Sequence, residues 1–123
     1  MIEGVVNVSY EAVCALPLRG PDGQVREIEA VIDTGYSGFL TLPPQVVAEL
    51  GLPFVTSAQA ILADGNEATF EVHSVTVLWD GQPLAVDAYA SDTTPLIGMR
   101  LLDQYDLHIQ VRDGGRVVIE ASM

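Results

Sequence analysis

The stretch Val31-Ile32-Asp33-Thr34-Gly35-Tyr36-Ser37-Gly38 decides how this chain is interpreted. Two β-branched apolar residues lead into an aspartate, and a threonine, two glycines and a serine follow in the same segment. β-Branched residues favour strands, and glycine permits backbone angles that other residues resist. The pattern therefore predicts a buried strand that delivers one carboxylate, Asp33, to a tight loop. Loop amides and the Ser37 hydroxyl can donate hydrogen bonds to that carboxylate.

Length and composition predict one globular domain spanning residues 1–123, because 49% of the residues are apolar. The 17 acidic and 5 basic residues give a net charge of -12. This charge argues against nucleic acid and anionic membranes as partners, since both attract Lys and Arg. No apolar run is long enough to cross a bilayer, and Met1-Ile2-Glu3-Gly4 lacks the order of a secretory signal. We therefore expect a soluble, cytoplasmic protein.

Other residues that could carry chemistry form weaker patterns. The single cysteine, Cys14, allows no internal disulfide and is expected to fill the core. His73 and His108 lie in separate predicted strands without the spacing of metal ligands, so we expect no metal site and no cofactor. Ser37 does not lie in a Gly-x-Ser-x-Gly elbow, which argues against a serine hydrolase.

Apolar residues recur with a period of two between closely spaced turn dipeptides, which predicts an all-β chain. The expected strands are Val5–Leu18, Val25–Ile32, Phe39–Leu42, Ala58–Ala63, Ala68–Val72, Val75–Trp79, Leu84–Ala90, His108–Val111 and Arg116–Ile119. Two short helices are expected, Gln45–Leu50, which Pro44 precedes and Gly51 follows, and Met99–Tyr105. Because no βαβ alternation is present, the strands predict a barrel or a sandwich.

The order of three segments resembles that of aspartic proteases of the retropepsin type. The Asp33 loop comes first, and the Ala63-Asp64-Gly65 hairpin follows where that family carries its flap. Leu96-Ile97-Gly98 comes next, where an aspartic protease lobe has a strand that supports the catalytic loop. The chain is most similar to small bacterial retropepsin-like proteins, over about Val5 to Val111. The resemblance implies a closed β-barrel lobe with one or two short helices.

The resemblance also implies a role for each matching residue. Asp33 would be the catalytic carboxylate, and Thr34 would form a hydrogen bond with the loop of a partner chain. The residues that would support the carboxylate are Gly35, Ser37 and Gly38. The flap would contain Asp64, Gly65 and Asn66, and the supporting strand would contain Leu96, Ile97 and Gly98.

One lobe supplies one aspartate. Peptide-bond hydrolysis by an aspartic protease needs two carboxylates, one that accepts a proton from water and another that donates a proton to the peptide carbonyl. The resemblance therefore implies a homodimer with Asp33 of each chain on the two-fold axis. It would hydrolyse a peptide or protein substrate at acid to mildly acid pH.

Two features depart from the retroviral pattern, the bulky Tyr36 and the additional hairpin His108–Ile119. The alternative function is a non-catalytic retropepsin-like β module that binds a peptide or protein partner through flap and groove.

Overall fold

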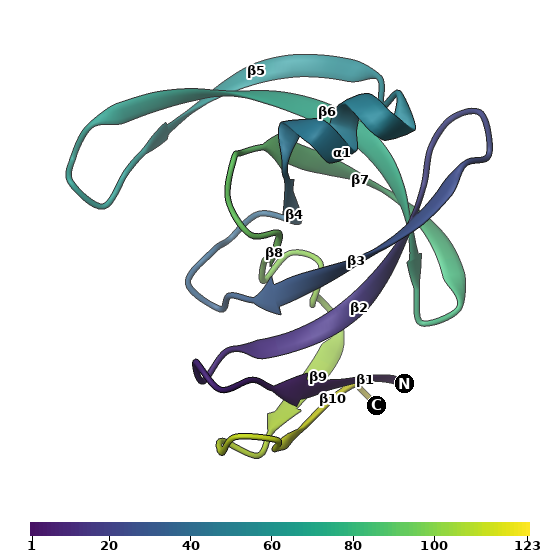
Figure 1. Cartoon of the computed structure of the whole chain (residues 1–123), viewed down its shortest axis with the longest axis vertical. Coiled ribbons are helices and arrows are strands. Elements are labelled where there is room, and N and C mark those ends of the chain that lie inside the picture. Colours follow the sequence, from purple (N-terminus) through teal and green to yellow (C-terminus); the bar gives the residue numbers. More distant parts are fainter.

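The computed structural model describes residues 1–123 and contains ten strands in one sheet and one helix (Figure 1). The strands are β1 (Ile2–Val6), β2 (Ala12–Arg19), β3 (Val25–Ile32), β4 (Leu40–Leu42), β5 (Phe54–Ile61), β6 (Glu67–Trp79), β7 (Gln82–Ala90), β8 (Leu96–Ile97), β9 (Tyr105–Ile109) and β10 (Arg116–Ala121). The helix is α1 (Pro44–Leu50), and at seven residues it is far too short to cross a bilayer. The all-β prediction is confirmed.

The strands follow the order β5-β6-β7-β4-β8-β3-β2-β1-β10-β9, and β2 also pairs with β6. Most neighbours are antiparallel, but β3 runs parallel to β8 and β4 runs parallel to β7. Alternate residues along β2 and β3 point into one core, as expected for strands with one buried face. Leu16, Leu18, Ala30, Leu40 and Ile97 are among its most deeply buried members.

The helix after β4 forms where its flanking residues predict it. Pro44 occupies the first turn, where a missing amide hydrogen has no consequence. Gly51 ends the helix in a left-handed conformation with a φ of 59°, which glycine adopts without strain. Val46, Val47 and Leu50 form the buried face of α1. The prediction of this helix is confirmed to within one residue.

The single strand predicted over Val5–Leu18 is wrong, because a turn divides it into β1 and β2. The side-chain oxygen of Asn7 accepts hydrogen bonds from the amides of Ser9 and Glu11, each at 3.0 Å. Tyr10 has a φ of 61°, a left-handed conformation that reverses the chain. Asn7 therefore ends β1 through a local side-chain contact that competes with strand pairing.

The helix predicted over Met99–Tyr105 is also wrong, because this segment forms a series of turns. The amide of Leu101 bonds to the carbonyl of Gly98, three residues earlier, and Gln104 has a φ of 69°. The left-handed residue stops any helical run before it reaches a second turn. The fold thus contains one helix where two were expected.

The strands predicted as Ala68–Val72 and Val75–Trp79 form one continuous strand, β6, which has thirteen residues. The N-terminal half of β6 pairs with β5, and β7 pairs with β6 from Val72 to Trp79. One long strand therefore belongs to both predicted hairpins and connects the projecting hairpin rigidly to the core of the sheet.

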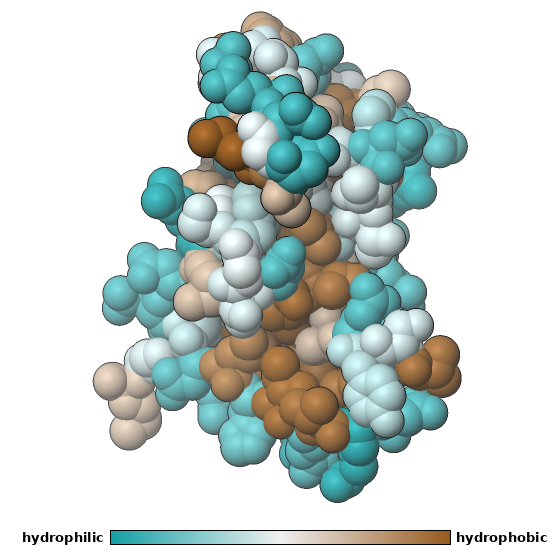
Figure 2. All heavy atoms as spheres, turned by 90° about the vertical axis from the view of Figure 1, so that its left-hand side faces the viewer, coloured by the Kyte–Doolittle hydropathy of each residue, from teal (hydrophilic) through white to brown (hydrophobic).

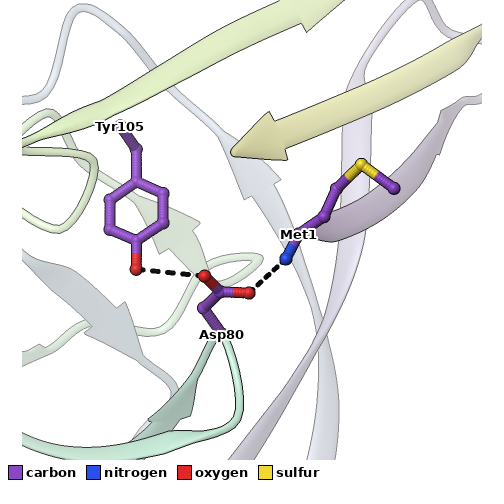
Figure 3. A network of polar contacts seen from close by, with 3 residues as sticks. All are labelled: Met1, Asp80 and Tyr105. Atoms are coloured by element: carbon purple, nitrogen blue, oxygen red, sulfur yellow. Dashed lines mark hydrogen bonds and ion pairs between the residues drawn. The ribbon is translucent and has the colours of Figure 1, made fainter. Parts of the chain in front are cut away.

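A polar network joins the chain start, the β6–β7 turn and the start of β9 (Figure 3). The carboxylate of Asp80 accepts hydrogen bonds from the amino group of Met1 and from the Tyr105 hydroxyl, the latter at 3.3 Å. The hydrogen bond from the amino group is the main cause that lowers the pKa of Asp80. The Tyr105 ring also packs edge-on against Trp79, with centroids 5.7 Å apart. These contacts hold the C-terminal hairpin against the rest of the sheet.

Candidate active site

Asp33 immediately follows β3, and two backbone groups fix its position. The Asp33 amide donates to the carbonyl of Ile97 in β8 at 2.9 Å. The amide of Gly35 donates to Oδ1 of the Asp33 carboxylate, also at 2.9 Å. The Asp33 carbonyl accepts from the amide of Tyr36 at 3.1 Å, which closes a tight turn. The Gly35 amide thus holds the carboxylate in one orientation. The Asp33 side chain is half-buried, so it keeps access to solvent.

Residues 98–100, which follow β8, are joined by backbone hydrogen bonds to the loop between β3 and β4 that carries Asp33. The amides of Gly98, Met99 and Arg100 donate to carbonyls of the loop between β3 and β4 at 2.8–3.1 Å. A Cβ on Gly98 would lie 2.1 Å from the carbonyl oxygen of Gly38, so the two backbones touch where a larger residue would not fit. The supporting segment Leu96-Ile97-Gly98 thus lies directly against the loop that carries Asp33.

Tyr36 fills the interior of this loop. A Cβ on Gly38 would lie 2.4 Å from the Tyr36 oxygen, which means that the ring folds back over Gly38. The Tyr36 hydroxyl donates to the carbonyl of Leu40 at 3.4 Å, and its ring meets the edge of Tyr89 with centroids 6.5 Å apart. Burial, and then the nearby Tyr89, raise the pKa of Tyr36 to about 12. Its bulk therefore serves the packing of the loop.

The residues predicted to form the flap lie at the tip of the β5–β6 hairpin. The Asp64 carboxylate accepts from the amide and the side-chain nitrogen of Asn66 at 2.9 and 3.0 Å, and Gly65 has a φ of 85°. In Figure 1 this hairpin projects from the body on the same side as the loop between β3 and β4. It is a self-contained turn whose hydrogen bonds are local, and no hydrogen bond joins its tip to the Asp33 loop.

The structure brings some predicted residues together and leaves others apart. Asp33, Gly35, Gly38 and the segment 96–98 form one hydrogen-bonded unit. Ser37 is exposed, and its hydroxyl makes no hydrogen bond within the chain. Thr34 is exposed beside Asp33 and has no side-chain partner within the chain. The roles assigned to Ser37 and Thr34 therefore stay predictions.

Three residues around this site were not predicted from the sequence. Phe70 of β6 and Tyr89 of β7 pack together with ring centroids 6.1 Å apart, so aromatic rings connect Tyr36 with the middle of the β5–β6 hairpin. Thr41 is buried in β4, and its hydroxyl oxygen accepts a hydrogen bond from the amide of Leu96 at 2.9 Å. The sequence places Phe70 and Tyr89 in two different predicted hairpins, so no local signal indicates that their rings meet.

A separate hollow lies between α1 and β6 and does not include Asp33. His73 lies in its wall and is buried, with Nδ1 2.9 Å from the carbonyl oxygen of Leu52 and Nε2 3.1 Å from a carboxylate oxygen of Glu71. Both ring nitrogens thus have protein partners. These contacts connect β6 to the segment after α1, which is a structural role at the base of the projecting hairpin.

The chain contains no group of three or more His, Cys, Asp or Glu side chains positioned to hold a metal ion. The Asp33 loop presents a single carboxylate, which the Gly35 amide orients and which is half-buried. No protein-family model matches this chain, and no curated protein matches it either.

Proposed function

We propose that this chain is one half of an aspartic endopeptidase of the retropepsin type, which is active as a homodimer. One observation carries the proposal: Asp33 emerges from a buried strand onto a loop whose own backbone orients the carboxylate, with Gly35 donating to Oδ1. A carboxylate that only capped a turn would not need the adjacent segment 96–100, which is bonded to the same loop by four backbone hydrogen bonds.

The proposed lobe is a closed barrel, and the strand pairings support this architecture. β6 pairs with β7, β7 with β4, β4 with β8, β8 with β3, β3 with β2, and β2 returns to β6. The return pairing joins Leu18 to Val77 and Arg19 to Thr76. A closed ring of strands leaves no free edge within the ring and gives the Asp33 loop a rigid base.

The proposed reaction uses the two Asp33 carboxylates of a dimer, which share one proton because like charges so close together do not both ionise readily. The ionised carboxylate accepts a proton from a water molecule, whose oxygen adds to the peptide carbonyl carbon. The protonated carboxyl donates its proton to the carbonyl oxygen. When the resulting gem-diol breaks the C–N bond, the departing amine takes up the proton that the first carboxylate accepted from water, and one diol hydroxyl gives its proton to the other carboxylate. No covalent enzyme intermediate forms.

The β5–β6 hairpin would cover an extended peptide in this dimer. Its backbone could pair with the peptide as an added strand, and its closure would exclude water from the two carboxylates. The apolar side chains of Ile61 and Leu62 near the tip support this role, because they are 76% and 42% exposed in the single chain. The substrate would be a peptide or protein segment in extended conformation.

Digestion of a peptide library between acid and neutral pH, with products identified by mass spectrometry, tests this proposal. Asp33→Asn keeps the size of the side chain and removes the carboxylate, so cleavage is expected to stop. Asp22→Asn, in the exposed turn between β2 and β3, is the matched control and is expected to cleave like the unaltered protein. Cleavage that survives Asp33→Asn would overturn the proposal, and binding without cleavage would favour a non-catalytic peptide-binding module.

A further inference from the structure

An apolar hollow of about 430 Å³ adjoins Asp33 on the side away from the β5–β6 hairpin. Eight of its eleven lining residues are hydrophobic, and the other three are Glu11, Asp33 and Thr34. Figure 2 looks at this side of the molecule, with hydrophobic surface over its lower half. In Figure 1 the β1–β2 turn and the tip of the β9–β10 hairpin occupy that region. The hollow and the Asp33 carboxylate thus share one surface.

Several large apolar side chains at this hollow are strongly exposed. Val111 is 74% exposed, Tyr10 is 67% exposed, and Val8 of the same turn is 77% exposed. We call these three residues, together with Ile109 and Leu96 of the hollow, the apolar face. Exposed apolar side chains gathered around an apolar hollow are a feature of contact surfaces.

The charge of the chain favours contact between copies on this face rather than elsewhere. Two molecules with a net charge of -12 repel each other unless the contact surface carries few acidic groups. Of the 17 acidic side chains, only Glu11 and Asp33 line the hollow. The Glu11 carboxylate accepts a hydrogen bond from the side chain of Asn7 at 3.0 Å, within its own chain.

The terminal strands cannot supply the contact, since both are already paired on each side. β1 lies between β2 and β10, and β10 lies between β1 and β9. Exchange of terminal strands between two chains would break these ladders. The strands with a free edge are β5 and β9, so β1 and β10 can meet a partner only through their side chains.

We propose that two copies of this chain meet through the apolar face, which sets Thr34 and Asp33 of each chain beside the two-fold axis. This inference rests on the proposed function, because a site with one carboxylate is incomplete without the second copy. If two Asp33 side chains come within hydrogen-bonding distance, the surfaces next to them must also face each other. Val8 and Tyr10 of the β1–β2 turn and Val111 of the β9–β10 loop then supply the apolar core of the interface.

Sedimentation equilibrium over a range of protein concentrations tests the surface with three variants. Val111→Glu adds a charge to each copy at the centre of the face and is expected to raise the dimer dissociation constant at least tenfold. Tyr10→Asn removes the exposed ring and keeps a residue that tolerates the left-handed backbone found there, so it should fold and also weaken the dimer. Val25→Glu is the control, because Val25 is 60% exposed and lies at the opposite end of β3 from Asp33.

Peptide hydrolysis measured on the same samples separates this inference from the proposed function. A dimer that Val111→Glu and Tyr10→Asn weaken, while Val25→Glu does not, supports the interface even if no sample cleaves peptide. Asp33-dependent cleavage by a dimer that these two variants leave unchanged would overturn the interface and leave the function standing. A wild-type chain that stays monomeric at all concentrations would overturn both. Thermal unfolding of each variant establishes that the weakened ones are folded.

Discussion

Gly98 and Gly38 lie with their backbones in contact, and a Cβ on Gly98 would come within 2.1 Å of the Gly38 carbonyl oxygen. The same Cβ would lie 2.7 Å from the ring of Tyr36. Neither neighbour can move freely, because Gly38 accepts a hydrogen bond from Arg100 and Tyr36 is packed inside the loop. This contact sets the distance between the Asp33 loop and the segment that supports it.

Gly98→Ala is therefore expected to force the two segments apart. We expect the free energy of unfolding to fall by about 3 kcal/mol, the upper end of the usual effect of overpacking, because the added Cβ meets backbone. Gly23→Ala in the β2–β3 turn is the control, because a Cβ there meets nothing and only the positive φ of 86° causes strain. It should lose about 1–2 kcal/mol. Urea unfolding measures both, and equal losses would mean that the Gly98–Gly38 contact is not close.

Thr41→Val tests the hydrogen bond between β4 and β8. The substitution keeps the shape of the side chain but leaves the Leu96 amide without its partner. We expect a loss of about 1–3 kcal/mol in the free energy of unfolding, the usual effect of an unpaired buried polar group. Thr76→Val on β6 is the control, since the Thr76 hydroxyl has no hydrogen bond in this chain. A Thr41→Val variant as stable as the control would contradict the assigned bond.

The stability of the fold is expected to fall in mildly alkaline solution because of Cys14. Burial raises the pKa of this thiol from 9.0 to about 11, so the folded chain retains its proton at pH values where the unfolded chain loses it. The effect is absent below pH 9.0 and grows as the pH rises toward 11. Denaturant unfolding should show a loss of about 1 kcal/mol between pH 8 and 10. Cys14→Ala should remove most of this slope, and an unchanged slope would show that another group causes it.

The β5–β6 hairpin tip is expected to behave as a mobile flap. The amides of Leu62 and Gly65 are bonded only within the tip, so their hydrogen exchange should be fast in the free protein. A pepstatin-like peptide should slow this exchange at least tenfold, on the order of the protection that closure over a ligand gives. The β6–β7 turn at Gly81 is an internal control that should not respond. Equal exchange at the tip with and without the peptide would count against the flap.

Local patterns in the sequence predicted many of the strands and the helix. Val25–Ile32 is a strand with the predicted ends, because alternating apolar residues follow a dense turn signal. α1 was predictable because Pro44 and Gly51 act through their own backbone angles. The turn at Asn7 was missed because the apolar alternation on either side of it outweighed one polar side chain.

Contacts between segments that are far apart in the sequence could not be predicted from local sequence patterns. Met99–Tyr105 has the apolar spacing of a helix, but its first amides bond to the carbonyls of Tyr36 and Gly38, more than 60 residues earlier in the chain. Thr41 and Leu96 are 55 residues apart, so nothing local predicts their bond. The sequence shows only that Tyr36 is bulky, because its inward packing depends on Gly38 and Tyr89 together. The Asp33 loop itself was predicted because its residues all lie in one short segment.

The pairing of two Asp33 carboxylates is tested most directly by mixing wild-type chains with Asp33→Asn chains at constant total concentration. If hydrolysis needs a carboxylate from each of two chains, the rate should follow the square of the wild-type fraction. It should then fall to about one quarter when half of the chains are wild type, because mixed dimers are inactive. A rate that falls in proportion, to about one half, would mean that each chain acts alone and would contradict the half-site account.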